Sequence, residues 1–280
     1  ANAGYDYAIV LPWLTDTLDF ASDHSDQKDT RSINSGHFVT DRPSFEAYPW
    51  PDAETGHCDI YQDLAAFVPD GMRLIVCGPC GVLENVIDLV GYERLCIMTL
   101  EDPELTRMLF DAVGSRLLTY YQICSQYDSV GALIVNDDWG FKSQTMLPPD
   151  SMREYVFPWH KKMVNAIHAA GKPAILHSCG NLNAVMHDVI HDMNYDGKHS
   201  FEDKIIPVEE AYTRWGGQIA VLGGIDMDFL ARKSPDQVAE RARHMLNISN
   251  EAGGYALGSG NSIPEFIPHK NYYAMISQIE

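Results

Sequence analysis

Seven short apolar runs, each followed by a glycine, proline or polar turn, constrain the fold of this chain more than any other feature. They cover residues 7–12, 73–77, 132–135, 173–177, a weaker run near Tyr195, 218–222 and 255–257. Stretches with helical periodicity lie between them, the clearest at 104–127, 149–170 and 235–253. Short, continuous apolar strands are typical of a parallel sheet covered on both faces. Regular alternation with helices implies right-handed crossovers between parallel strands.

We therefore predict an α/β fold, a (β/α)8 TIM barrel that forms one domain over residues 1–280. A chain of 280 residues, 45% of them hydrophobic, is large enough to fill such a core. The pattern assigns no eighth strand, so a doubly wound open sheet is the alternative. Residues 1–4 lead straight into the first apolar run, and we expect an upstream segment to be missing.

One long segment, residues 28–58, interrupts the alternation. Its pattern predicts a hairpin or an excursion over the barrel mouth. Long ordered loops in barrels are usually functional, so His37 in this segment is predicted to bind substrate.

The charge balance excludes several partner classes. Lys and Arg number 20 against 39 Asp and Glu, a net charge of -19, which leaves no electrostatic footprint for nucleic acid or an anionic membrane. The sequence contains no apolar run of spanning length and no signal-peptide pattern. Six cysteines in a chain with this much core favour reduced thiols, and hence the cytoplasm.

Polar and soft side chains gather where the predicted strands end. In a barrel, the active site lies at the carboxyl ends of the strands, so these residues form the candidate site. They are Cys77, Cys80, Asp137, Asp138, His177, Cys179, His199, Asp226 and Asn261.

His177 and Cys179 are two positions apart at one strand end. Side chains with this spacing share a face, and imidazole nitrogen with thiolate sulfur suits zinc. An inert pairing of a buried His with a Cys is the alternative. Cys77 and Cys80 form a C-x-x-C pattern, for which simple packing is favoured because no thioredoxin-like context is present.

Acidic and aromatic residues complete the predicted site. Asp137 and Asp138 are neighbours on a strand, so one of them is expected to point into the site, while capping of a turn is the alternative. Asp226 has the same two readings, and the preceding glycines suggest close approach of a ligand or of backbone. The predicted catalytic residues are Asp137, Asp138, His199 and Asp226. Trp139 is predicted to wall a flat substrate, and core packing is the alternative for it.

A series of motifs follows the chain over nearly its whole length: Gly78-Pro79, Asp102-Pro103-Glu104-Leu105, Asn136-Asp137-Asp138-Trp139-Gly140, Phe157-Pro158, His168-Ala169-Ala170-Gly171-Lys172, Leu176-His177-Ser178-Cys179-Gly180-Asn181, Gly223-Gly224-Ile225-Asp226 and Gly258-Ser259-Gly260-Asn261-Ser262-Ile263-Pro264. The order of these motifs is similar to that of the uroporphyrinogen decarboxylase superfamily. One branch of this superfamily decarboxylates porphyrinogens without a metal. The other consists of zinc-dependent methyltransferases that exchange a methyl group with a corrinoid protein.

The resemblance to the methyltransferase branch implies that His177 and Cys179 are zinc ligands. Those enzymes supply another Cys in the late glycine-rich segment, where this chain has Asn261. Catalytic zinc takes about three protein ligands, so the third must come from elsewhere. Glu84, His199, Cys80 and Asp226 are candidates, and weak binding by Asn261 is the remaining option; we assign Glu84 to the metal and Asn261 to substrate binding.

We therefore predict a zinc-dependent methyltransferase that moves a methyl group between a small donor or acceptor and a corrinoid (cobalamin-type) protein. A uroporphyrinogen decarboxylase-type enzyme of porphyrin biosynthesis is one alternative, although the arginine-rich start that the resemblance implies for that branch is missing: Arg31 is the only arginine in the first forty residues. A non-catalytic corrinoid- or tetrapyrrole-binding protein is another alternative. No nucleic acid or membrane partner is expected, and a homodimer stays open.

Overall fold

A computed structural model describes residues 7–11, 18–20, 32–54 and 60–279 of the chain. The predictions made for residues 1–4, for Pro12 at the end of the first strand, for Arg31 and for Cys58 lie outside these ranges.

All seven predicted strands are present. They are β1 Tyr7–Val10, β2 Arg73–Cys77, β3 Val130–Asn136, β4 Ala174–His177, β5 Gly197–His199, β6 Ala220–Leu222 and β7 Tyr255–Ala256. They follow the chain in the sheet order β1-β2-β3-β4-β5-β6-β7. The pairs β1–β2, β2–β3, β4–β5, β5–β6 and β6–β7 are parallel. The parallel α/β sheet is thus confirmed, while the eighth strand of a closed barrel is not found among the described residues.

Helices occupy the connections between the strands. They are α1 Arg42–Ala47, α2 Ile60–Ala65, α3 Val82–Val90, α4 Tyr92–Glu101, α5 Pro103–Cys124, α6 Pro149–Ser151, α7 Phe157–Ala169, α8 Val208–Trp215, α9 Met227–Arg232, α10 Pro235–Ser249 and α11 His269–Ile276, with the π-helical turns η2 Met152–Val156 and η3 Asp188–Asp192 and the 3₁₀ turn η4 Ser277–Ile279. Within the described part of the chain, no helix is both long and apolar enough to cross a membrane.

The chain forms two compact units. We call Tyr7–Asp138 with Leu147–Ala174 the N-terminal unit, and Trp139–Met146 with Ile175–Glu280 the C-terminal unit. The prediction of one domain over residues 1–280 stays a prediction.

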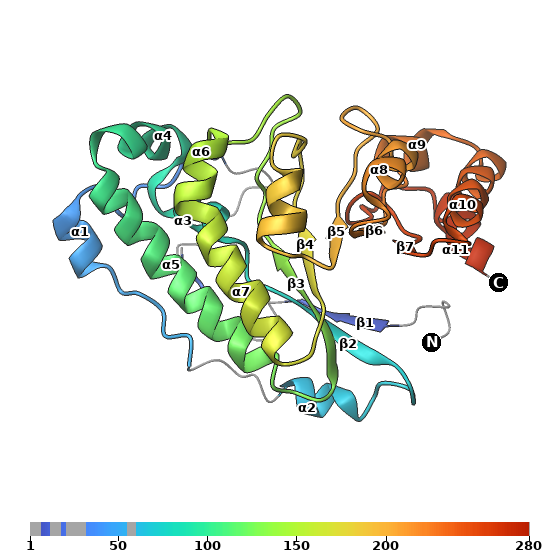
Figure 1. The fold of residues 1–280 in the computed structure, drawn as a ribbon, viewed down its shortest axis with the longest axis horizontal. Helices are drawn as coiled ribbons and strands as arrows, with labels where there is room; N and C mark the ends of the chain where they lie inside the picture. The colour runs from blue at the N-terminus through green and yellow to red at the C-terminus, as the bar shows by residue number, and fades with distance from the viewer. Residues whose placement is uncertain (1–6, 12–17, 21–31, 55–59, 280) are drawn as a thin grey trace. The chain divides into compact units, whose positions relative to one another are not determined.

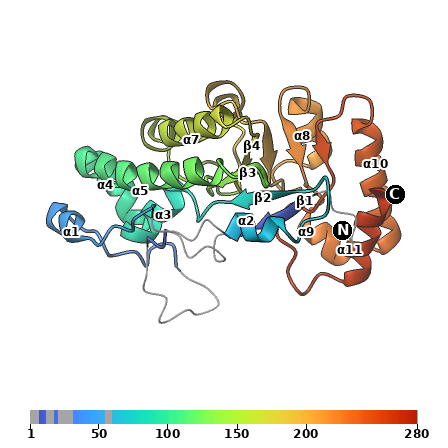
Figure 2. The same cartoon turned by 90° about the horizontal axis from the view of Figure 1, so that it is seen from below.

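In the N-terminal unit, α5 and α7 lie side by side (Figures 1 and 2). Asp102 caps α5 by accepting the Leu105 N–H at 3.0 Å, and Pro103 fits the first turn, where no N–H is needed. Close packing of the two helices requires Gly114, because a Cβ there would lie 2.2 Å from the ring of Trp159. The sequence therefore determines both where α5 begins and how tightly it packs.

The hairpin predicted within residues 28–58 is wrong for the described residues 32–54, which hold α1 and no strand. Asp41 and Ser44 form a reciprocal capping box, and Pro43 follows the cap. These local signals outweigh the short alternation that precedes them. The segment is hydrogen-bonded to the end of helix α3, where the N–H groups of Phe38 and Val39 donate to the Leu89 carbonyl. The predicted excursion over the barrel mouth stays a prediction.

The C-terminal unit has its own apolar core. It is formed by Phe201, Ile206, Val208, Ala211, Tyr212, Val221, Ile225, Leu230, Val238, Ala242, Met245, Ile267 and Met275. Helix α10 begins at a capping box of Ser234 and Gln237, as the Ser-Pro-Asp start predicts, and packs against α11. Each large side chain buried here contributes about 1.5–3 kcal/mol.

A charge cluster joins three segments of this unit. The guanidinium of Arg241 on α10 donates to both carboxylate oxygens of Asp203 at 2.7 Å and to those of Glu209 on α8 at 2.7 and 2.8 Å. It also lies 4.8 Å from the ring centroid of Phe229. The Arg241 side chain is 11% exposed, so removing it leaves two carboxylates without their cation.

We expect Arg241→Ala to lower the free energy of unfolding by about 3 kcal/mol, the lower end of the cost of breaking a buried ion pair, because Asp203 and Glu209 keep some exposure. Urea unfolding measures the change. Arg243→Ala, on the exposed side of the same helix, is the matched control. Equal destabilisation by the two variants would show that the cluster has no special role.

Candidate functional site

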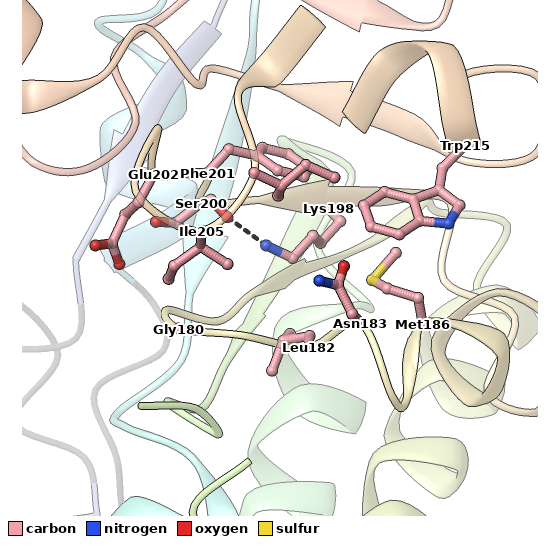
Figure 3. A pocket seen from close by; sticks show the side chains of 11 residues that line it. Gly180, Leu182, Asn183, Met186, Lys198, Ser200, Phe201, Glu202, Ile205 and Trp215 are labelled. Carbon is pink, nitrogen blue, oxygen red and sulfur yellow. Dashed lines mark hydrogen bonds between the residues drawn. The ribbon is translucent and has the colours of Figure 1, made fainter. Parts of the chain in front are cut away.

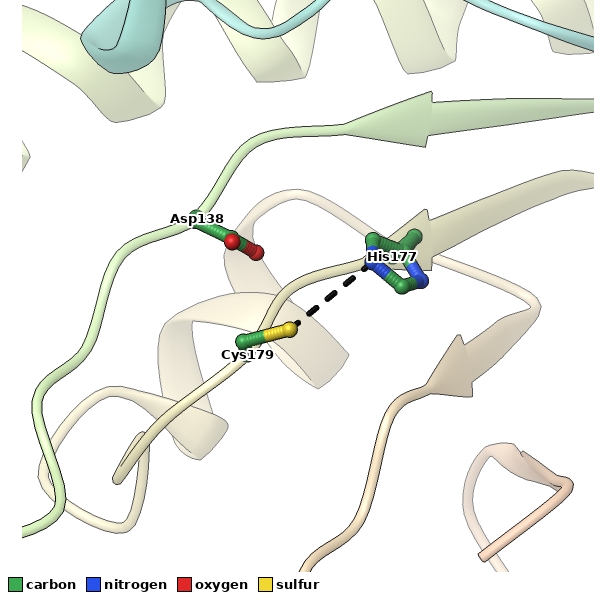
Figure 4. A group of neighbouring side chains, drawn as sticks. All are labelled: Asp138, His177 and Cys179. Carbon is green, nitrogen blue, oxygen red and sulfur yellow. Dashed lines mark hydrogen bonds between the residues drawn. The ribbon is translucent and has the colours of Figure 1, made fainter. Parts of the chain in front are cut away.

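His177 and Cys179 lie together where β4 ends. His177 is its last residue, and its Nε2 lies 3.9 Å from the Cys179 Sγ (Figure 4). Both side chains are half-buried. The strand spacing predicted that these two side chains share a face, and the structure confirms that they adjoin.

The turn that carries Cys179 is held by residues 139–146, which belong to the same unit. The Trp139 N–H donates to Ser178 Oγ at 3.1 Å, and the Asn181 N–H donates to the Phe141 carbonyl at 2.8 Å. Gly180 has φ +84°, and a Cβ there would lie 2.0 Å from the Gly140 carbonyl oxygen. Only glycine permits this backbone contact, which fixes the turn after Cys179.

His199, at the end of β5, contacts the far side of the His177 ring. The two Nδ1 atoms are 2.8 Å apart, and His199 Nε2 lies 3.1 Å from the Ser259 carbonyl oxygen. A carbonyl only accepts, so His199 Nε2 carries a hydrogen. Burial and the neighbouring His177 lower the pKa of His199 to about 4, so the ring is neutral and its Nδ1 accepts. His177 then donates from Nδ1, which leaves its Nε2 lone pair facing Cys179.

Gly223 makes this arrangement possible. Its φ is +69°, and a Cβ there would lie 2.2 Å from the Ser259 carbonyl oxygen and 2.9 Å from the His199 ring. The expected close approach at this glycine is therefore one of backbone. The glycine follows β6 and brings the segment after β7 to the ring of His199.

Two polar groups contact the Cys179 sulfur. Asn261 donates from Nδ2 at 3.3 Å, and the Ser200 hydroxyl lies 3.8 Å away. The Asn261 Oδ1 accepts the Ser262 N–H at 2.8 Å, which determines the orientation of the amide. Asn261 is thus a hydrogen-bond donor to the sulfur, while its side-chain oxygen accepts from the backbone.

Asp138 supplies the carboxylate nearest to this pair. It is the residue directly before Trp139 in the chain. One ligand atom from each of Asp138, His177 and Cys179 lies within 4.8 Å of the others (Figure 4). Among the described residues, these three form the one such group of His, Cys, Asp or Glu.

The three donors fit zinc. Bonds of about 2.3 Å to sulfur and about 2.0–2.1 Å to nitrogen at a tetrahedral angle place the two ligand atoms about 3.6 Å apart. The observed separation of 3.9 Å needs a shift of only a few tenths of an ångström. Nitrogen, sulfur and oxygen donors are those that catalytic zinc uses, with a fourth position left for substrate.

Asp137 has a different role from its neighbour. It is fully buried, and its oxygens accept the N–H groups of Leu83 at 2.9 Å and Glu84 at 3.0 Å. The buried His160 Nε2 lies 3.0 Å from the same carboxylate. Asp137 therefore caps the start of α3, which is the capping role that the sequence analysis gave as its alternative. Asp138 is the aspartate directed to the site (Figure 4).

Other candidates of the N-terminal unit are distributed around α3. Burial and the carboxylates of Asp137 and Asp138 raise the pKa of Glu84 to about 8, and Glu84 accepts the Gly81 N–H at 3.0 Å. Burial and Glu84 raise the pKa of Cys77 to about 12, and that of Cys80 is raised as well. Both thiols are therefore protonated at neutral pH; Cys77 is half-buried and Cys80 is exposed. The carboxylate grouped with His177 and Cys179 is that of Asp138, not of Glu84.

Three further residues that were predicted for the site make contacts that stabilise the fold. Asp226 caps α9 by accepting the N–H groups of Asp228 and Phe229, and it also accepts that of Asp203. Trp139 is fully buried in the C-terminal unit. His37 stacks on Phe38 and lines a hollow between the 34–40 segment and α4 in the N-terminal unit.

Lys198 is a residue that the sequence patterns did not single out. It is buried on β5, and its Nζ donates to the carbonyls of Ser178 and Ser200 and lies 4.1 Å from the Phe201 ring centroid (Figure 3). The pocket beside it has a volume of about 10 Å³, room for one water molecule. Lys198 therefore links the turns after β4 and β5, and a lysine inside an otherwise short buried strand is the signal that could have found it.

Comparison with known proteins tests the resemblance. The family model "Uroporphyrinogen decarboxylase (URO-D)" matches residues 59–280, well over half of the chain. The chain belongs to the uroporphyrinogen decarboxylase family. Curated relatives in this family include the uroporphyrinogen decarboxylases of Anaeromyxobacter dehalogenans, 25% identical over 76% of the chain, and of another Anaeromyxobacter species, 24% identical over 79% of it. The chain spans 63% and 62% of their lengths.

Solved structures share the fold of this uroporphyrinogen decarboxylase family member. A methyltransferase from Methanosarcina mazei has a TM-score of 0.65 at 19% identity, covering 79% of this chain and 62% of its own. A putative vitamin-B12 independent methionine synthase from Listeria monocytogenes has a TM-score of 0.54 at 13% identity, covering 100% of this chain and 83% of its own. At these identities the likeness concerns the fold.

Proposed function

We propose that this member of the uroporphyrinogen decarboxylase family is a zinc-dependent methyltransferase that moves a methyl group between a small substrate and a corrinoid carried by a separate protein. The observation that carries the proposal is the donor set of His177 Nε2, Cys179 Sγ and the Asp138 carboxylate. A metal-free decarboxylase would not need the nitrogen and sulfur donors of this set. The proposal includes a closed (β/α)8 barrel with this site at its carboxyl-terminal mouth.

Zinc bound by these residues would act as a Lewis acid that lowers the pKa of a substrate thiol or hydroxyl. The chain's own residues prepare the ligands. His199 accepts from His177 Nδ1, which keeps the ring hydrogen off Nε2, and Asn261 donates to the Cys179 sulfur. With a thiol acceptor, the carbon–sulfur bond forms as the cobalt–carbon bond of the methylated corrinoid breaks. The bonding pair stays on cobalt, and the thiol proton passes to water.

The fold comparisons support this proposal alongside the donor set. One solved structure of similar fold is a methyltransferase, at an identity that supports the architecture and not the reaction. The corrinoid protein is the proposed partner, and the chain's net charge of -19 would favour a basic docking face on it. The proposal also leaves open a homodimer, in which a second copy of the chain is the partner.

A porphyrinogen decarboxylase is the second candidate. It is favoured by the names of the curated relatives, although they are 25% identical or less. In this case His177 and Cys179 would have no metal, and Asp138 would have to stabilise a positively charged pyrrole. The two candidates differ in whether activity survives removal of metal.

The test is an activity assay with and without zinc. Methylcobalamin with 2-mercaptoethanol, and cob(I)alamin with a methyl aryl ether, are the probes, and the change in corrin absorbance is the readout. We expect turnover in at least one direction that a chelator abolishes and zinc restores. Decarboxylation of uroporphyrinogen that persists after chelation would overturn the proposal in favour of the second candidate.

Metal measurements need one precaution. His187 and His191 are exposed, and their ring centroids are 4.7 Å apart on one helical turn, so this pair can collect a second ion. Titrations are therefore best made in a His191→Ala background. About one zinc per chain is expected there.

A further inference from the structure

Each of the two adjoining ligand side chains at the end of β4 is contacted by a polar partner from a different strand end. His177 contacts His199, the last residue of β5, and Cys179 contacts Asn261, which follows β7. All four residues belong to the C-terminal unit. The two contacts differ in direction, since one partner accepts a hydrogen bond and the other donates one.

The His199 contact can satisfy every group in only one direction. A metal on His177 Nε2 requires the hydrogen of that ring to be on Nδ1, where His199 Nδ1 accepts it at 2.8 Å. The hydrogen of His199 is then on Nε2 and points to the Ser259 carbonyl at 3.1 Å. In the reverse direction His177 Nε2 would carry a hydrogen toward the metal. Ligating histidines in general need such a partner on their other nitrogen.

The Asn261 contact has a fixed direction as well. The Ser262 N–H occupies Asn261 Oδ1 at 2.8 Å, so Nδ2 is the group that faces Cys179 at 3.3 Å. The Ser259 hydroxyl donates to the Asn261 carbonyl at 2.7 Å and stiffens the turn. An amide N–H pointed at sulfur stabilises the thiolate and draws electron density from it. Asn261 therefore tunes the sulfur ligand without binding the metal itself.

We propose that His199 and Asn261 are positioning residues that set the two zinc ligands from opposite sides, His199 by holding His177 in its Nδ1–H tautomer and Asn261 by donating to the Cys179 thiolate. This inference rests on the proposed metal site. Ser259 is common to both arms, because its carbonyl accepts from His199 and its hydroxyl bonds the Asn261 carbonyl. A single turn after β7 thus controls both ligands.

The experiment uses cobalt(II) in place of zinc and reads affinity and the thiolate-to-cobalt charge-transfer band of the full chain. His199→Leu removes the acceptor and should weaken binding about 10–100-fold, the usual cost of losing an outer partner. His199→Asn keeps an oxygen acceptor near the position of Nδ1 and should restore most of the affinity. Asn261→Leu should move the charge-transfer band to lower energy, because a thiolate without its donor gives up an electron more easily.

Matched controls are His269→Leu and Asn247→Leu, which change the same residue types at exposed positions of the C-terminal unit. Neither should alter affinity or the band. If wild type binds cobalt and His177→Ala does not, while His199→Leu and Asn261→Leu behave like wild type, this inference is overturned and the metal site stands. If wild type binds no cobalt in folded form, the metal site and this inference are both overturned.

Discussion

Replacing His177 or Cys179 by alanine is expected to lower zinc affinity by more than about 100-fold, beyond the range for loss of an outer partner. Each variant removes one of the three donors, and two donors at a half-buried site cannot hold zinc against water. Competition with a chromophoric chelator measures the affinity. The fold should be retained, because neither side chain belongs to the buried core.

His269→Ala is the control for this pair, since it removes an exposed histidine of the same unit. It should leave the affinity within a few-fold of wild type. Tight zinc binding that survives both His177→Ala and Cys179→Ala would mean that the metal binds elsewhere. The methyltransferase proposal would then lose its main support.

Substitutions of the neighbours Asp137 and Asp138 should affect different properties: that of Asp137 mainly the stability of the fold, and that of Asp138 mainly the zinc affinity. Asp137→Ala removes a cap of α3, which costs about 1 kcal/mol, and leaves the buried His160 without its acceptor, which costs about 1–3 kcal/mol. We expect a loss of about 3 kcal/mol in unfolding free energy, with zinc affinity of the folded protein kept within about tenfold. Asp138→Ala should lower zinc affinity by at least about tenfold and change stability much less.

Urea unfolding and zinc titration of both variants make the comparison. Asp137→Asn keeps one oxygen acceptor, so it replaces Asp137→Ala in both measurements if Asp137→Ala fails to fold. An unchanged zinc affinity in Asp138→Ala would remove this residue from the ligand set. If Asp137→Asn instead lost zinc while remaining folded, the two aspartates would have to exchange roles.

The strands were predictable because each is a short apolar run that ends in a glycine or a polar turn. The parallel sheet follows from the helices between them. The hairpin was not predicted correctly for residues 32–54, the described part of the 28–58 segment, since Phe38, Val39 and Thr40 have the composition of a strand. The capping box of Asp41 and Ser44 was present in the sequence and outweighs that pattern in the structure.

Spacing alone predicted that His177 and Cys179 share a face, because alternation along a strand needs no tertiary information. The choice between Asp137 and Asp138 did need it, since the start of α3 decides which carboxylate becomes a cap. The same holds for Asp226, which caps α9. His199 was predicted as a catalytic residue, and its contact with His177 depends on Gly223 and on the turn after β7. Contacts between distant strand ends leave no local pattern.

The central claim is that zinc is bound by one sulfur together with nitrogen and oxygen. X-ray absorption at the zinc edge of the zinc-loaded His191→Ala chain, which keeps all three proposed ligands, tests it most directly. The account predicts one sulfur at about 2.3 Å and nitrogen or oxygen neighbours at about 2.0–2.2 Å, with the sulfur signal lost in Cys179→Ala. A first shell of nitrogen and oxygen alone in the parent protein would contradict it.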